Sequence, residues 1–282
     1  MAEGGNAVTI RKYCGKRLRV DSLRILSVSL MVAALPVSMP ARGEDFSQYV
    51  SPWRTPWDYN GPRGAAHWSE LDPDYAVCNT GREQSPIDIR SARKTRLPPI
   101  RFEYRGSPVN YVINNGHTIR VNYHDAPGSG NFLVVGDKRY HLTQFHFHRP
   151  SEEYLNGKRY DMVLHLMHTA DDGEVAGVAV MLEKGNANQT IQRVWDHMPA
   201  KEGQEAAPGV NLDPSSMLPH DTGYFQYRGS VTAPPCTEGV QWFVMKGTVS
   251  ISARQIAAFA RLYPNDVRPV QPLNGRIVVE SE

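Results

Sequence analysis

The chain has 282 residues, of which 21% are charged and 40% are hydrophobic, and its net charge is +2. This size and composition fit one large globular domain or two small ones. Seven Lys or Arg and only two acidic residues precede Glu44, so the rest of the chain is mildly acidic. The sequence has no basic stripe with interleaved aromatic residues, which argues against nucleic-acid binding.

The first 43 residues have the features of an export signal. A basic region that ends at Arg24 precedes the apolar run ILSVSLMVAALPV, which is short for a transmembrane helix and contains Pro36. We expect cleavage after Gly43, with residues 1–43 as signal peptide and 44–282 as a periplasmic or secreted domain without a membrane anchor. The alternatives are an uncleaved anchor or a start codon assigned too early.

Two cysteines, Cys78 and Cys236, lie in the expected mature part, whereas Cys14 precedes the apolar run. An even pair of cysteines in an exported protein indicates a disulfide. The alternative is a pair of unrelated buried thiols.

Residues 44–84 are rich in Trp, Pro, Gly and Asp, which predicts an irregular arm with aromatic side chains that must pack onto the rest of the domain. From residue 86 onwards, short runs alternate apolar and polar residues and are separated by turn clusters such as NNG and ADDG. This pattern predicts a mostly β domain. The runs are IDIR, VNYVINN, TIRVNY, FLVVG, FHFH, MVLHLMH, VAGVAVML and WFVMKGTVSI.

Helical periodicity is clear in residues 252–263, SARQIAAFARLY, which begin with a Ser N-cap and stop before Pro264. A weaker helical candidate is NQTIQRVWDHM, residues 188–198. Because no internal repeat or long linker is visible, we expect a single domain.

A metal site is predicted from three histidines. His146 and His148 lie two residues apart in a predicted strand, so they share one face while Phe145 and Phe147 occupy the other. The strand MVLHLMH adds His165. Three neutral imidazoles leave one position of a zinc tetrahedron open, which is typical of a catalytic site. The H-x-H spacing also occurs in other metal-binding folds.

The motifs around these histidines closely resemble the α-class carbonic anhydrases. They occur in the family's order from Trp57 to the C-terminus and comprise REQSPIDI, NNGH, QFHFH with SEE and LHLMH, GSVTAPPCTEGVQW, and RPVQPLNGR. The resemblance implies a large twisted, mainly antiparallel central sheet with few short helices and a zinc site at the base of a conical cavity. It also implies reversible hydration of carbon dioxide to bicarbonate and a proton.

The resemblance makes His146, His148 and His165 the zinc ligands, with zinc hydroxide as the attacking group. Thr232 matches the threonine that accepts a hydrogen bond from that hydroxide, and Glu152 matches the carboxylate that accepts the threonine proton.

Two further residues follow from the same resemblance. His117 matches the proton-shuttle histidine, for which an exposed imidazole with a pKa near 6.5 is suited. Gln144 is placed to orient the ring of His146.

Several positions depart from the family pattern. Val163 stands where many members have a glutamate behind the third ligand. Either another group or a water accepts from His165 instead, or His165 is held less firmly, and we expect that Val163→Glu tightens zinc retention. We assign Val231, Met167 and Gly177 to the substrate pocket. Further differences are Ala233 after the threonine and Arg120 on the wall near the proton path.

Two other functions are consistent with parts of the sequence. His146, His148, Glu152 and Gly157 come close to the first motif of a cupin, but the second histidine motif of that fold is not visible. A catalytically inactive relative that acts as a binding module would typically lack one zinc histidine, and all three are present. The sequence does not distinguish a monomer from a homodimer.

Overall fold

The computed structural model describes residues 55–109, 111–123, 130–202, 205–206 and 210–282. All of these residues belong to one compact unit. The expected signal peptide lies outside the described residues. Within those residues, no helix is sufficiently long and apolar to cross a membrane.

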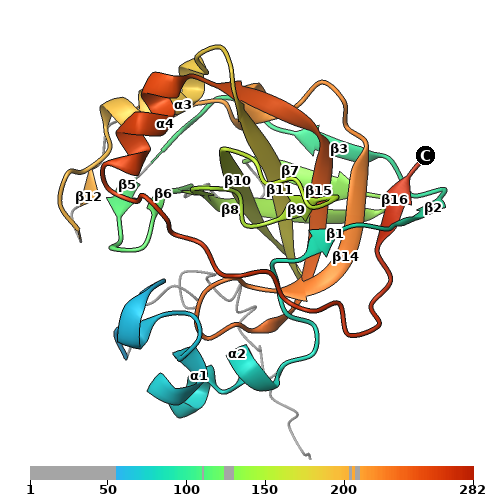
Figure 1. Cartoon of the computed structure of the whole chain (residues 1–282). Helices are drawn as coiled ribbons and strands as arrows, with labels where there is room; N and C mark the ends of the chain where they lie inside the picture. Colours follow the sequence, from blue (N-terminus) through green and yellow to red (C-terminus); the bar gives the residue numbers. More distant parts are fainter. Residues whose placement is uncertain (1–54, 110, 124–129, 203–204, 207–209) are drawn as a thin grey trace, which may run out of the picture. The chain divides into compact units, whose positions relative to one another are not determined.

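A twelve-stranded sheet forms the centre of the fold (Figure 1). Its main path runs in the order β12-β5-β6-β8-β10-β11-β15-β14-β16-β2, and β7 joins β3 to β8. The strands are β2 (Arg93–Thr95), β3 (Ile100–Glu103), β5 (Tyr111–Asn114), β6 (Ile119–Asn122), β7 (Phe132–Val135), β8 (Lys138–His148), β10 (Met162–Ala170), β11 (Val175–Lys184), β12 (Glu205–Ala206), β14 (Tyr224–Ser230), β15 (Glu238–Ile251) and β16 (Val279–Ser281).

The sheet is mixed, since β11 pairs with β15 and β16 with β2 in parallel, whereas the other pairs are antiparallel. This confirms the expected mostly β class with a mainly antiparallel sheet. Two small sheets accompany it, formed by β1 (Asp88–Ile89) with β9 (Tyr154–Leu155) and by β4 (Ser107–Pro108) with β13 (Asn211–Leu212).

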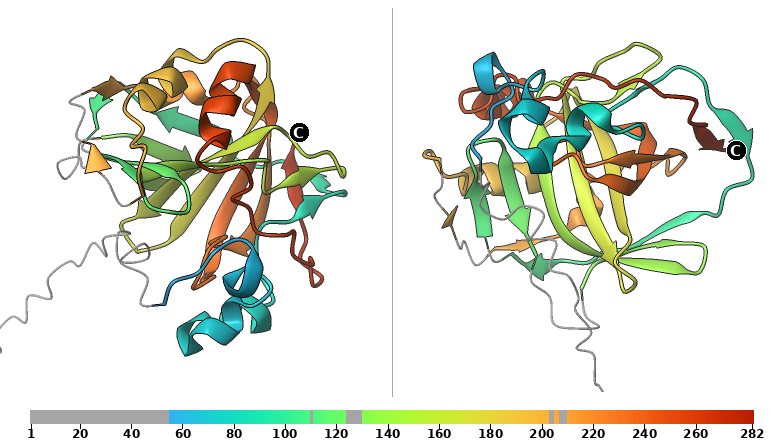
Figure 2. Two further views of the ribbon diagram at one scale, coloured as in Figure 1. Left: turned by 60° about the vertical axis from the view of Figure 1, so that its left-hand side comes forward. Right: turned by 90° about the horizontal axis from the view of Figure 1, so that it is seen from below.

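Two short helices cover part of one sheet face. The helix α3 (Gln189–Asp196) begins at the N-cap Asn188, and α4 (Ala253–Ala260) begins with a capping box between Ser252 and Gln255. Both predicted helices are confirmed, although α4 ends before residue 263. They lie side by side (Figure 1, and the left-hand view of Figure 2). Their apolar side chains join the larger core cluster, in which Trp195 contacts Phe147 with ring centroids 4.6 Å apart.

The arm before the sheet consists of short helical turns. These are η2 (Gly61–Arg63), α1 (Trp68–Leu71), η3 (Pro73–Tyr75) and α2 (Val77–Thr80), and a later turn, η4, spans Pro214–Met217. Trp57, Trp68 and Tyr75 of the arm are buried in a cluster that includes Cys236. The arm therefore packs its aromatic residues as predicted, onto the segment that follows β14.

Candidate metal centre and active site

Three histidines from two adjacent strands meet on one face of the sheet. The antiparallel register of β8 and β10 places His165 opposite His146, while Val163 lies opposite His148. Strand alternation sends Phe145 into the larger core cluster on the other face. One ring nitrogen from each of the three histidines lies within 4.8 Å of the others, so the group can hold a metal ion.

Each of these histidine rings is oriented by a hydrogen bond through its other nitrogen. His146 Nδ1 lies 2.9 Å from Gln144 Oε1, and His148 Nδ1 lies 2.7 Å from the backbone oxygen of Asp266. His165 Nε2 lies 3.0 Å and 3.2 Å from the two carboxylate oxygens of Glu153. Because those acceptors fix the tautomers, the opposite nitrogens face one another as lone-pair donors.

The facing nitrogens of the two most buried rings make no hydrogen bond to the described residues. His148 Nε2 and His165 Nδ1 are buried and have no hydrogen-bonding partner among the described residues. Buried nitrogens normally have a partner, so their convergence fits a cation. Three imidazoles with a vacant fourth direction match a catalytic rather than a closed structural zinc site.

The environment also sets the charge of these rings. Burial and the neighbouring histidines lower the pKa of His146 and of His148 well below the usual value, so both rings are neutral. Burial lowers the pKa of His165 too, but the carboxylates of Glu153 and Glu152 raise it by more, and the net shift is upward. Neutral imidazole is the form that binds a metal.

Glu153 decides between the two alternatives for Val163. Valine occupies the position two residues before His165 on β10, so either another group accepts from His165 or the ring is held less firmly. In the structure, the fully buried side chain of Glu153, in the turn after β8, lies within hydrogen-bonding distance of His165 Nε2. His165 is therefore held by a carboxylate from another element, and the reason for expecting Val163→Glu to tighten zinc retention is removed.

Glu152 and Thr232 lie beside the histidines. Glu152 is fully buried, and its Oε2 lies 3.5 Å from His148 Nε2 and 3.9 Å from His165 Nδ1. Its Oε1 accepts a hydrogen bond of 2.8 Å from the backbone N–H of Arg268. Burial raises the pKa of Glu152 to about 7, while the neighbouring side chains of His165 and Thr232 act in the opposite direction. A cation held by the histidines would lower that pKa further.

A cavity opens above the three histidines. Its lining includes apolar and polar residues, namely Trp57, Tyr59, Asn115, His117, Thr118, Arg120, Gln144, Met167, Val231, Thr232, Ala233, Pro234 and Trp242. Met167 and Val231, expected in the substrate pocket, are both in this lining. Gly177 is not: a Cβ there would lie 2.7 Å from the indole of Trp242. The glycine makes room for Trp242, which forms the wall in its place.

His117 lines the cavity but is not the exposed imidazole that the sequence suggested. Its ring stacks on Trp57 with centroids 3.7 Å apart, and its Nε2 lies 2.9 Å from the backbone oxygen of Trp57. The side chain is half-buried, and burial lowers its pKa.

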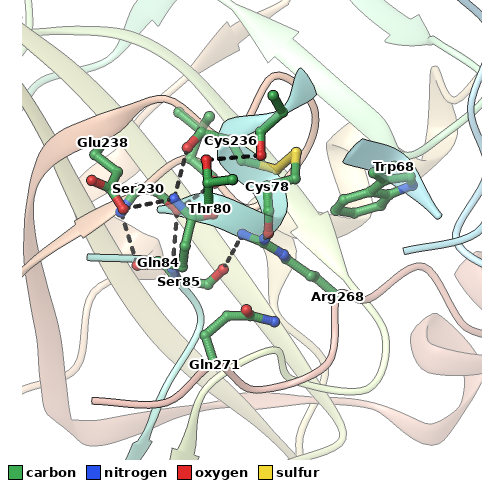
Figure 3. The surroundings of a disulfide bond; sticks show 12 residues. Trp68, Cys78, Thr80, Gln84, Ser85, Ser230, Cys236, Glu238, Arg268 and Gln271 are labelled. Atoms are coloured by element: carbon green, nitrogen blue, oxygen red, sulfur yellow. Dashed lines mark hydrogen bonds between the residues drawn. A yellow bond between two sulfur atoms is a disulfide. The ribbon is translucent and has the colours of Figure 1, made fainter. Parts of the chain in front are cut away.

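The predicted disulfide between Cys78 and Cys236 is present, with a Cα–Cα distance of 5.0 Å. It joins α2 to the segment just after Thr232 (Figure 3). The second cysteine thus belongs to the same connection between β14 and β15 that carries the threonine.

Three site residues had no signal of their own in the sequence. Glu153 is adjacent to Glu152, and the sequence motif gave a role to Glu152 alone. Asp266 contributes a backbone oxygen, which every residue possesses. Trp242 ends the motif GSVTAPPCTEGVQW, and that position was the signal that could have identified it.

Comparisons with known proteins agree on one family. The model of the family described as eukaryotic-type carbonic anhydrase matches residues 63–282. A curated carbonic anhydrase of Nostoc sp. is 40% identical over 271 residues, which cover 93% of this chain and 97% of the relative. The solved α-carbonic anhydrase from Thermovibrio ammonificans, in complex with the inhibitor sulfanilamide, is 41% identical with a TM-score of 0.76 and covers 80% of this chain and 99% of its own. The Photobacterium profundum α-carbonic anhydrase is 39% identical, with a TM-score of 0.73 and coverage of 79% and 100%.

Proposed function

Because the chain belongs to the α-class carbonic anhydrase family, a family of carbonate dehydratases, we propose that it catalyses the zinc-dependent, reversible hydration of carbon dioxide to bicarbonate and a proton. The observation that carries this proposal is the convergence of three oriented imidazole nitrogens at one end of a cavity. The extent of the family match also favours this function over a cupin.

His146, His148 and His165 would hold the zinc ion through Nε2, Nε2 and Nδ1, because their other nitrogens are engaged by Gln144, Asp266 and Glu153. When bound, zinc supplies the Lewis acidity that makes water a nucleophile at neutral pH. Imidazole binds a metal in its neutral form, so three such ligands would leave the positive charge of the ion uncancelled within the coordination sphere.

Thr232 and Glu152 would orient the attacking water. The threonine hydroxyl has one proton, and the neighbouring carboxylate of Glu152 would accept it in a hydrogen bond. Thr232 Oγ1 can then only accept, so it favours a group that carries a proton and disfavours one that does not. The apolar side chains of Met167, Val231 and Trp242 offer carbon dioxide a surface beside that position.

His117 would carry the released proton out of the cavity. The backbone oxygen of Trp57 can only accept, so Nε2 of the neutral ring is protonated and Nδ1 takes up the next proton. The lowered pKa keeps the ring neutral, and so able to accept, at physiological pH.

We propose further that residues 1–43 are an export signal and that 44–282 form the working enzyme in the periplasm or outside the cell. The disulfide supports an oxidising compartment.

Removal of zinc tests the proposed function. Dialysis against a chelator should abolish carbon dioxide hydration, and added zinc should restore it, because each histidine ring has its own hydrogen bond to Gln144, Asp266 or Glu153. His146→Ala should remove activity that zinc cannot restore. Stopped-flow hydration with parallel zinc analysis measures both, and full activity in a verified zinc-free preparation would refute the proposal.

A further inference from the structure

Thr232 and Glu152 come from different parts of the chain, so something must hold them in register. Thr232 lies in the connection between β14 and β15, and Glu152 lies in the turn after β8. Whether the Thr232 hydroxyl can donate to Glu152 depends on their relative placement. The structure shows how each is anchored, and the two anchors meet at one segment, residues 78–85.

The connection that carries Thr232 is fastened to this segment on both sides. Before the threonine, Ser85 N donates to Ser230 Oγ at 2.9 Å, and Ser230 N donates to Ser85 Oγ at 3.1 Å. After it, Cys236 is bonded to Cys78, and Gln84 Nε2 donates to the backbone oxygen of Cys236 at 3.1 Å. These contacts surround the disulfide in Figure 3.

Glu152 is fastened to the same segment through Arg268. The backbone N–H of Arg268 donates to Glu152 Oε1. The guanidinium of Arg268 donates to the backbone oxygens of Ser85 and Cys78, each at 2.8 Å (Figure 3). Arg268 is only 3% exposed and lies over the ring of Trp68. Burial lowers its pKa to about 10, so the side chain is still a cation at neutral pH.

We infer that Arg268 is a positioning residue that holds Glu152 in register with Thr232, through a guanidinium clamp on the disulfide-linked segment 78–85. The inference rests on the proposed function of Thr232 and Glu152. A backbone N–H can be supplied by any residue except proline, so the side chain matters here because it fixes where that N–H lies. The fixed fork of donors in arginine allows one side chain to reach two carbonyl oxygens.

Substitution of Arg268 tests the clamp, because Arg268→Met keeps the backbone N–H and removes the guanidinium. The binding of sulfanilamide, whose nitrogen can donate a proton to Thr232, is compared with that of thiocyanate, which has no proton to donate. Both are measured by titration of zinc-loaded protein. We expect sulfanilamide to bind about 10-fold more weakly relative to thiocyanate, at the low end of the usual cost of losing an outer hydrogen-bonding partner.

Arg276→Met is the matched control. Arg276 belongs to the same C-terminal segment and donates to four backbone oxygens, including that of Gln84 at 2.8 Å, but it does not contact Glu152. A purely structural arginine would lower the melting temperature in either variant without changing the binding ratio. An unchanged ratio in Arg268→Met, or an equal change in Arg276→Met, would overturn the inference.

Two further arms keep the outcome decisive. If Arg268→Met does not fold, Arg268→Lys decides in its place: its single ammonium cannot hold both carbonyl oxygens in the arginine geometry, so the ratio should shift in the same direction, and an unchanged ratio counts against the clamp. The ratio is a binding measurement, so it is readable without turnover. Wild-type protein that binds zinc but does not hydrate carbon dioxide would refute the proposed function alone.

Discussion

Glu153 shows that a hydrogen-bond acceptor missing from one strand can be supplied by a side chain from another part of the chain. In the sequence, valine occupies position 163, where many family members have a glutamate that accepts a hydrogen bond from the third ligand. In the structure, Glu153 occupies the same role from the turn after β8, with His165 Nε2 3.0 Å from its carboxylate. Both side chains are fully buried, so this interaction is shielded from water.

Glu153→Gln should accelerate the loss of zinc. The amide still offers an oxygen, but it lacks the charge that strengthens the bond to the ring N–H, and such partners are typically worth about 10–100-fold in metal affinity. The rate of zinc transfer to a coloured chelator measures the effect. Glu183→Gln is the control, since that glutamate is exposed and pairs with Lys158.

A paired exchange sharpens this test. Val163 lies on the same face of β10 as His165, so Glu153→Val combined with Val163→Glu should recover most of the zinc retention. Val163→Glu alone would place two carboxylates in one buried site, which is unfavourable. Equal zinc loss from wild type and Glu153→Gln would show that Glu153 does not hold the ligand.

His117→Ala should lower the maximal turnover in dilute buffer far more than kcat/KM, because proton export follows the carbon dioxide step. Added imidazole should restore much of the loss. In wild type, the buffer-independent turnover should rise with pH through a pKa below the usual 6.5 of histidine, since burial disfavours the protonated ring.

His220→Ala is the control for this histidine, as His220 is exposed and not in the cavity lining. Unchanged turnover of His117→Ala in dilute buffer would mean that protons leave by another route.

Among the elements, the strands that carry the ligands could be predicted from their own residues. Alternation in FHFH placed His146 and His148 on one face and the phenylalanines on the other, and the structure has this arrangement. The start of helix α4 could also be predicted from local sequence, because Ser252 and Gln255 form its capping box. These features depend on local periodicity and capping, which a short stretch of sequence contains.

Contacts between elements could not be predicted in this way. Periodicity does not reveal that β8 pairs with β10 in the register that sets His165 opposite His146, and the family resemblance supplied that expectation. Gly177 was assigned to the pocket by position alone. Its actual role depends on Trp242 of β15, the strand that pairs with β11 in parallel and is distant in sequence.

At the scale of the molecule, the ends of the described chain close around the site. The arm comes from its beginning, and its Tyr59 lies against the ring of His148 with centroids 6.4 Å apart. Asp266 comes from near its end and binds the same histidine through its backbone oxygen. Such closure depends on contacts that are remote in sequence. Without the family resemblance, the pair of cysteines is what predicted one such contact from the residues themselves.

The disulfide should therefore stabilise the whole domain. Cys78 and Cys236 are separated by 158 residues, and a cross-link that closes so long a loop reduces the entropy of the unfolded chain. Replacement of both cysteines by serine should lower the free energy of unfolding by roughly 2–5 kcal/mol. Urea unfolding of the oxidised wild type, the reduced wild type and the double variant measures this, and the two proteins without the bond should agree. The intact mass of exported protein provides an independent check of the bond and of the cleavage site. It should equal the mass of a chain that begins at Glu44, minus the two hydrogens lost when the disulfide forms. Free thiols in that protein, or equal stability of all three samples, would contradict the prediction.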